Sequence, residues 1–223
     1  MKSVKSLSII AVLSLGFAAC SSNKSDEKST AAIAETLSGE SLHCENVEIV
    51  SMPATDGKSK PVKMKYETLI DATRFFSVDG TVEKTADKGT KTFKVYVETE
   101  KGEFELSSSA ESVFESEDSK TATTLENGDV KEVGIVKATH TSGSEPQLTE
   151  NSYEQIVRTK DGVKKIVYKL VDGAEVPSPD IETTEKVEEG IKTISSILKT
   201  PFVEQSSNVT TESSSSICTV KKQ

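Results

Sequence analysis

Histidine and serine are the first side chains to consider for catalysis or metal binding in this chain. It has only two histidines: His43 lies beside Cys44, and His140 lies in a threonine-rich segment without a partner in sequence. Zinc sites need three or four ligands, and a nucleophilic serine needs a base. The Ser-Gly-Ser segment at 142–144 does not match the G-x-S-x-G nucleophile elbow. The sequence therefore predicts no metal, no cofactor and no catalytic residues.

Acidic residues are numerous, and their densest group is Glu115, Glu117 and Asp118. A calcium loop needs carboxylates at alternate positions, as in D-x-[DN]-x-[DN]-G, and no stretch supplies them. We interpret the group as a solvated strand end or loop. A glycosidase-type carboxylate pair stays open because carboxylates are so frequent.

The N-terminal residues have the pattern of an export signal. Lys2 and Lys5 precede an apolar run from Leu7 to Leu15, and polar residues follow soon after. A membrane-spanning helix needs about 20 apolar residues, whereas a signal peptide needs only about 7–15. We therefore expect residues 1–19 to be a signal peptide.

Residues 17–20, Phe-Ala-Ala-Cys, end this segment. They resemble the lipobox of bacterial lipoproteins, although Phe17 stands where leucine is most often found. The resemblance implies cleavage before Cys20 and covalent lipid on that cysteine, and two or more acyl chains give stable anchoring. Ser21, in place of aspartate, points by the enteric sorting rule to the outer membrane. We expect a lipid-anchored protein of the bacterial cell envelope, with its face, periplasmic or surface, left open.

With lipid on Cys20, two cysteines remain, Cys44 and Cys218. An even pair in an exported protein is read first as a disulfide. This bridge would close a loop long enough to contribute up to about 5 kcal/mol to stability in the chain-entropy model. Two free buried thiols are the alternative.

The expected organisation is a signal peptide at 1–19, a lipidated N-terminus and flexible tether at 20–40, and a single β-rich domain at 41–223. Residues 21–32 are polar and have too little apolar surface to offset the entropy of ordering.

The net charge of the chain is −9, and removal of Lys2 and Lys5 makes it two units more negative. Such a protein is repelled by nucleic acid, so no nucleic-acid partner is expected. Aromatic residues make up 5% and tryptophan is absent, which argues against sugar-stacking platforms and a large apolar ligand cavity.

The domain has the alternation of half-buried antiparallel strands. Val62, Met64 and Tyr66 alternate with charged residues, and so do Phe93 and Val95. Further runs of this kind lie at 46–52, 73–78, 103–106, 110–116, 120–126, 130–139, 152–159 and 163–170. Turn pairs lie between them at 56–57, 79–80, 101–102, 127–128, 161–162 and 172–173, each ending in glycine. These features predict a mainly β fold, an antiparallel meander of about eight to ten strands forming a curved sheet or half-barrel.

Residues 181–199 are expected to form one amphipathic helix. Val187, Ile191, Ile194 and Leu198 recur at helical spacing, and Pro201 follows. We expect the helix to pack across one face of the sheet.

Three functional hypotheses follow. The first is a non-enzymatic envelope lipoprotein that binds another envelope protein or has a structural role. The second is a carrier of lipid or another hydrophobic ligand, by analogy with half-barrel lipoprotein carriers. The third is a hydrolase with an unrecognised site.

Overall fold

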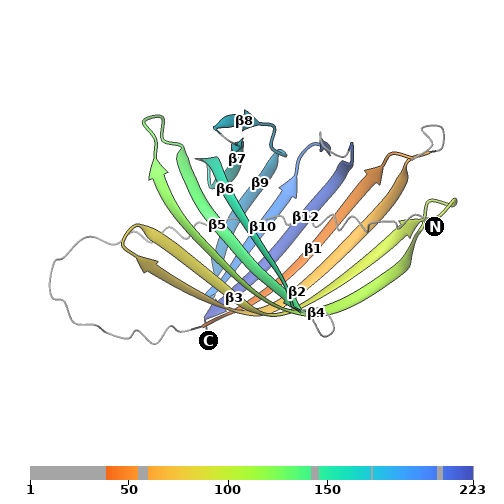
Figure 1. The fold of residues 1–223 in the computed structure, drawn as a ribbon, viewed down its shortest axis with the longest axis horizontal. Coiled ribbons are helices and arrows are strands. Elements are labelled where there is room, and N and C mark those ends of the chain that lie inside the picture. The colour runs from red at the N-terminus through yellow and green to blue at the C-terminus, as the bar shows by residue number, and fades with distance from the viewer. Residues whose placement is uncertain (1–38, 55–59, 142–145, 172, 205–207, 223) are drawn as a thin grey trace. The chain divides into compact units, whose positions relative to one another are not determined.

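The structure is a computed structural model that describes residues 39–54, 60–141, 146–171, 173–204 and 208–222. Its regular elements are all strands (Figure 1): β1 (Glu40–Met52), β2 (Val62–Asp79), β3 (Val82–Glu98), β4 (Phe104–Thr124), β5 (Val130–Thr141), β6 (Pro146–Lys160), β7 (Val163–Val171), β8 (Ala174–Val176), β9 (Ile181–Glu188), β10 (Ile191–Leu198), β11 (Phe202–Val203) and β12 (Thr210–Lys222). Among the described residues there is no helix long and apolar enough to cross a membrane.

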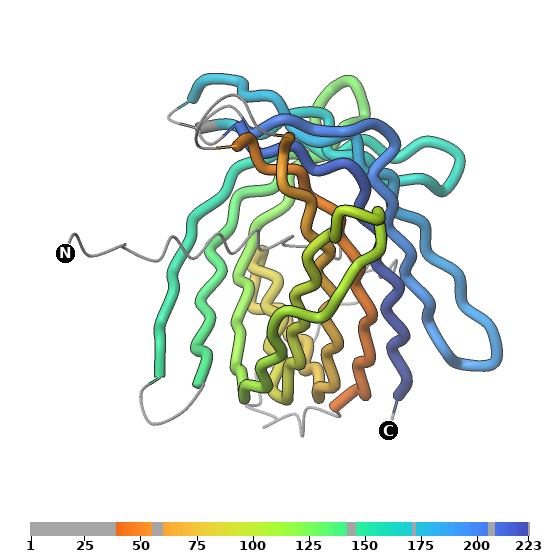
Figure 2. The backbone as a smooth tube through the Cα atoms, turned by 90° about the vertical axis from the view of Figure 1, so that its right-hand side faces the viewer, coloured from red at the N-terminus to blue at the C-terminus, as the bar shows by residue number. Residues whose placement is uncertain are grey.

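The strands close into an antiparallel barrel. In the described residues ten strands pair in the order β1 to β7, β9, β10 and β12, and β12 pairs back with β1. Figure 2 shows the first strand, in orange, beside the last strand, in dark blue. The mainly β, antiparallel prediction is confirmed. The half-barrel prediction is wrong, because the β1–β12 pairing removes both free sheet edges.

The strands are longer than the sequence pattern predicts. The separate runs expected at 103–106, 110–116 and 120–126 belong almost entirely to the single strand β4, and the run at 73–78 is the end of β2. The stretches between these runs, at 68–72, 107–109 and 117–119, contain serine, threonine and acidic residues, and strand pairing continues through them. Long strands that bend around a barrel therefore looked like several short ones.

Tight turns occur where the glycine pairs predict them. Gly80, Gly102, Gly128 and Gly162 connect consecutive strands, and each has a positive φ between 62° and 85°. A positive φ is sterically open to glycine but rarely adopted by other residues. The pair at 56–57 and Asp172 of the pair at 172–173 lie outside the described residues.

The predicted helix at 181–199 is wrong: this segment is the β9–β10 hairpin. Glu189 and Gly190 have φ values of 50° and 79°, the two positive values of a type I′ hairpin turn. Ile194 and Leu198 are buried, whereas Val187 is 68% exposed. The apolar residues have helical spacing because the buried Ser196 and its partner Thr183 take inward positions of these strands in place of apolar residues.

One face of every long strand lines the barrel interior. In the β1–β12 register Cys44 lies opposite Cys218, and the two form a disulfide with Cα atoms 4.1 Å apart, as predicted. The buried residues on this face are Leu42, Cys44, Val50, Phe114, Lys120, Glu132, Gly134, Gln155, Ile194, Ser196, Leu198, Ser214, Ser216, Cys218 and Val220. About half of them are polar or charged, so the barrel is not filled by an apolar core alone.

Candidate functional site

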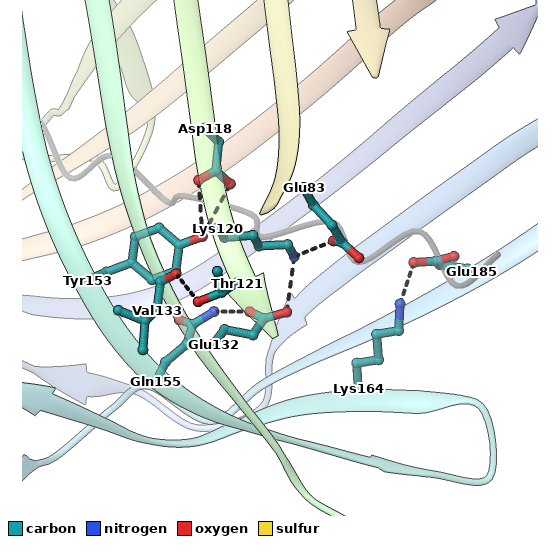
Figure 3. A network of polar contacts seen from close by, with 10 residues as sticks. All are labelled: Glu83, Asp118, Lys120, Thr121, Glu132, Val133, Tyr153, Gln155, Lys164 and Glu185. Carbon is teal, nitrogen blue, oxygen red and sulfur yellow. Dashed lines mark hydrogen bonds and ion pairs between the residues drawn. The ribbon is translucent and has the colours of Figure 1, made fainter. Parts of the chain in front are cut away.

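A buried ion pair links β4 to β5 inside the barrel. Lys120 is 5% exposed and Glu132 is 2% exposed, and the Lys120 Nζ lies 3.0 Å from the Glu132 Oε1. Gln155 of β6 donates to the other oxygen of Glu132 at 2.7 Å, and Glu83 of β3 lies 3.9 Å from the lysine. Figure 3 shows these four side chains converging. They link four consecutive strands across the interior.

Tyr153 extends this network on β6. Its hydroxyl donates to the carboxylate of Asp118, with O–O distances of 3.0 and 3.3 Å (Figure 3). The ring lies against Gly134, where a Cβ would be only 2.6 Å from the Tyr153 Cζ, so a glycine makes room for the tyrosine. Burial raises the pKa of Asp118 above its usual value and, as the largest cause, also raises the pKa of Tyr153. The tyrosine therefore stays protonated and keeps donating.

Two further groups of ion pairs join neighbouring strands on the interior face of the barrel. Arg74 of β2 donates through two nitrogens to both oxygens of Asp87 of β3, at 2.7 and 2.6 Å. Lys164 and Lys192 both contact Glu185 of β9, at 2.8 and 2.9 Å. Each carboxylate here is held by cations or donors from neighbouring strands. This arrangement stabilises the closed barrel and leaves these groups poorly suited to proton transfer.

The acidic side chain of Glu48 lies on the interior face near the seam, the place where β1 pairs with β12. Few groups there stabilise its charged form. Burial raises the pKa of Glu48 on β1, and the hydrogen bond from the Thr211 hydroxyl at 3.3 Å opposes this shift only partly. Two residues earlier on the same face, the Asn46 Oδ1 is buried with no hydrogen-bond partner among the described residues. This part of the interior is polar but not fully satisfied.

We expect Glu48→Gln to increase the free energy of unfolding at neutral pH. Because the pKa of Glu48 is higher in the folded protein than in the unfolded chain, folding binds protons, and its contribution to stability improves as the pH falls through the folded pKa. The variant should also show a weaker gain in stability between neutral and mildly acidic pH. Urea unfolding at both pH values measures this. The exposed Glu105→Gln should leave both values unchanged, and equal behaviour of the two variants would contradict the assignment.

A hollow of about 330 Å³ lies on the outer face of β2 to β5. Its lining residues are Phe75, Ala86, Asp87, Lys88, Glu115, Ser116, Glu117, Lys137 and Thr139. Lys88 contacts Glu115 at 2.5 Å, and Lys137 contacts Glu150 at 3.3 Å. Glu117 contacts no cation among the described residues. The hollow is therefore polar and lined by both lysines and carboxylates, with Phe75 as its aromatic residue.

The structure separates several residues that the sequence places together. Glu115 and Glu117 lie on the outer face of β4, whereas Asp118 faces the interior, because neighbouring residues of a strand point to opposite faces. All three lie within the strand, so the expected strand end or loop is wrong.

The two histidines lie on opposite faces of the barrel. His43 is on the outer face, with its Nδ1 2.7 Å from the Asp71 Oδ1, and this hydrogen bond is the main cause that raises its pKa. His140 faces the interior and stacks on Phe114 with ring centroids 6.3 Å apart. No group of three or more His, Cys, Asp or Glu side chains is placed to hold a metal ion in the described ranges. Cys20 and the 142–144 segment lie outside those ranges.

Sequence reasoning missed the interior network of Lys120, Glu132, Gln155 and Tyr153. Its signal was the presence of polar residues at alternate positions that point to the same face as buried apolar ones. That signal can be interpreted only once the strand register is known.

Comparison with protein-family models, curated proteins and solved structures gives no match to this chain.

Proposed function

We propose that this protein is a non-enzymatic lipoprotein of the bacterial cell envelope, anchored in the outer membrane through lipid on Cys20, whose barrel binds another envelope protein. The observation that carries the binding role is the outer hollow. It combines Phe75 with the carboxylate of Glu117, which accepts a hydrogen bond from Ser119 at 3.3 Å but contacts no cation among the described residues, so it suits a protein segment that presents a basic side chain beside an apolar one.

The charged interior argues against the alternative role as a lipid carrier. An acyl chain inside the barrel would have to pack against Lys120, Glu132, Arg74 and Asp87, which are all deeply placed and hydrogen-bonded. Displacing such pairs leaves buried charges unpaired, at a cost of several kcal/mol. A closed barrel is nevertheless compatible with lipid binding, so native mass spectrometry of the protein from its own envelope is the test of this alternative.

The anchor is tested by Cys20→Ser. We expect the wild-type protein to incorporate a fatty-acid analogue and to sediment with membranes, and the variant to lose both properties, because no acyl chain then holds it. Cys44→Ser is the matched control, since it removes a cysteine but leaves the lipidation site. A Cys20→Ser protein that is still labelled and membrane-bound would overturn the anchor.

The partner is tested by a photo-crosslinking amino acid at position 75 in the hollow, with position 193 on the outer face of β10 as the control. We expect one reproducible envelope-protein adduct from position 75 and none from position 193. The adduct should weaken when Glu117 is changed to Lys, because that change reverses the charge in the hollow. Identical adducts from both positions, or none from position 75, would contradict binding at the hollow.

A further inference from the structure

Two basic side chains face the barrel interior in adjacent transverse rows, two strands apart and away from the buried networks described above. Lys91 belongs to β3 and His140 to β5, and β4 lies between these strands. In the register, Phe114 of β4 lies directly opposite His140, and Ser112 lies opposite Lys91. Lys91 is in the same transverse row of interior residues as Cys44.

Lys91 has no carboxylate to neutralise it among the described residues. Three other interior lysines do, since Lys120, Lys164 and Lys192 each contact a carboxylate within 3.0 Å. Lys169 of β7, which lies opposite the inward-facing Gln155, resembles Lys91 in that burial alone lowers its pKa. Burial alone lowers the pKa of Lys91. Burial, and then the positive charge of Lys91, lower the pKa of His140.

Among the described residues, the neighbours of the two basic groups across the sheet are uncharged. Lys91 is flanked across the sheet by Ile70 and Ser112, and His140 by Phe114 and Gln147. The nearest charged groups in the neighbouring interior rows are Arg74 and Asp87, which are bonded to each other. Desolvating an ammonium group without a partner costs free energy, and a bound anion would offset that cost.

We propose that Lys91 and His140 form a binding site for a small oxyanion, a phosphate or a carboxylate, on the interior face of the barrel. The lysine supplies a point charge, which is a common way of binding phosphate. The histidine supplies a ring N–H, and the hydroxyl of Ser112 is a third donor. This hydroxyl now makes only a 3.5 Å hydrogen bond to the Lys91 carbonyl, so it is free to turn toward a ligand. The site is independent of the anchor and of the outer hollow.

The test is an NMR titration of the mature lipidated protein in detergent micelles, with the two histidine rings as reporters. His43, on the outer face, is the internal reference, and the His43→Gln variant assigns the signals. Inorganic phosphate and succinate are added separately at constant ionic strength. We expect either anion to shift the His140 signals saturably and to raise the pKa of His140 by about one unit, because an opposite charge then lies beside the ring. The His43 signals should not saturate.

Variants of the lysine identify the site. Lys91→Met should weaken anion binding about tenfold or more, the factor that a hydrogen bond to a charged group provides. Lys91→Arg should retain binding, and Lys94→Met, on the outer face of the same strand, should bind as the wild type does. If His140 responds to neither anion differently from His43, the proposal is wrong. It is equally wrong if Lys91→Met, folded by circular dichroism, binds as tightly as Lys94→Met. Failure to crosslink at position 75 has no bearing on either result.

Discussion

Replacing Lys120 with methionine should lower the free energy of unfolding by about 3–5 kcal/mol. The change leaves Glu132 with one donor, Gln155, and no cation at 3.0 Å, and an uncompensated buried carboxylate carries a cost of this size. Lost packing contributes little to this decrease, because the methionine side chain largely replaces the methylene groups of the lysine. Urea unfolding, followed by circular dichroism, measures it.

Two matched variants distinguish burial from charge. Lys131 on β5 pairs with Glu154 on the outer face, and its side chain is 40% exposed, so Lys131→Met should cost less than about 1 kcal/mol. The double variant Lys120→Met with Glu132→Met should regain most of the lost stability, because it removes both buried charges. A Lys120→Met variant no less stable than Lys131→Met would contradict the role of the network.

Changing both Cys44 and Cys218 to alanine should destabilise the protein by about 3–5 kcal/mol. The bridge closes a loop of sequence separation 174 and lies at the seam where β12 pairs with β1. Without it, the barrel must bring its first and last strands together at the full entropic cost of that loop. The midpoint of urea unfolding measures the change, and a shift between reducing and non-reducing gels reports the bridge itself.

Treating the wild-type protein with reductant is the control for the effect of the disulfide at the seam. Reduced wild-type protein should unfold at nearly the same urea concentration as the double alanine variant, since both lack the crosslink. Unchanged stability after reduction would show that strand pairing alone holds the seam.

The sequence was most informative about local structure. Alternation around Tyr66 and Phe93 correctly indicated strands, and the turn glycines correctly indicated where most strands end. Both signals come from short-range sterics and the two-residue period of a strand, so they need no knowledge of distant residues. The failure at 181–199 has a physical cause: Ser196 and Thr183 occupy inward positions and bond to each other at 2.8 Å, so the apolar residues no longer alternate.

The candidate sites were much less predictable. The carboxylates of Glu132 and Glu117 look alike in sequence, yet one is buried in an ion pair and the other faces the hollow. The same applies to His43 and His140. Burial and partners depend on which strands become neighbours, and those contacts join residues far apart in the chain.

The sequence by itself determined the β character of the domain, most of its turns and, through its cysteine pair, one crosslink. It also carries the lipobox-like segment from which the anchor is proposed. Only the tertiary structure decided that the sheet closes, that Cys44 and Cys218 meet at the seam, and that Lys120 and Lys91 face the interior. The reason is that the alternation of apolar and polar residues distinguishes the two faces of a strand. Which of these faces is removed from water is decided only when the sheet closes into a barrel.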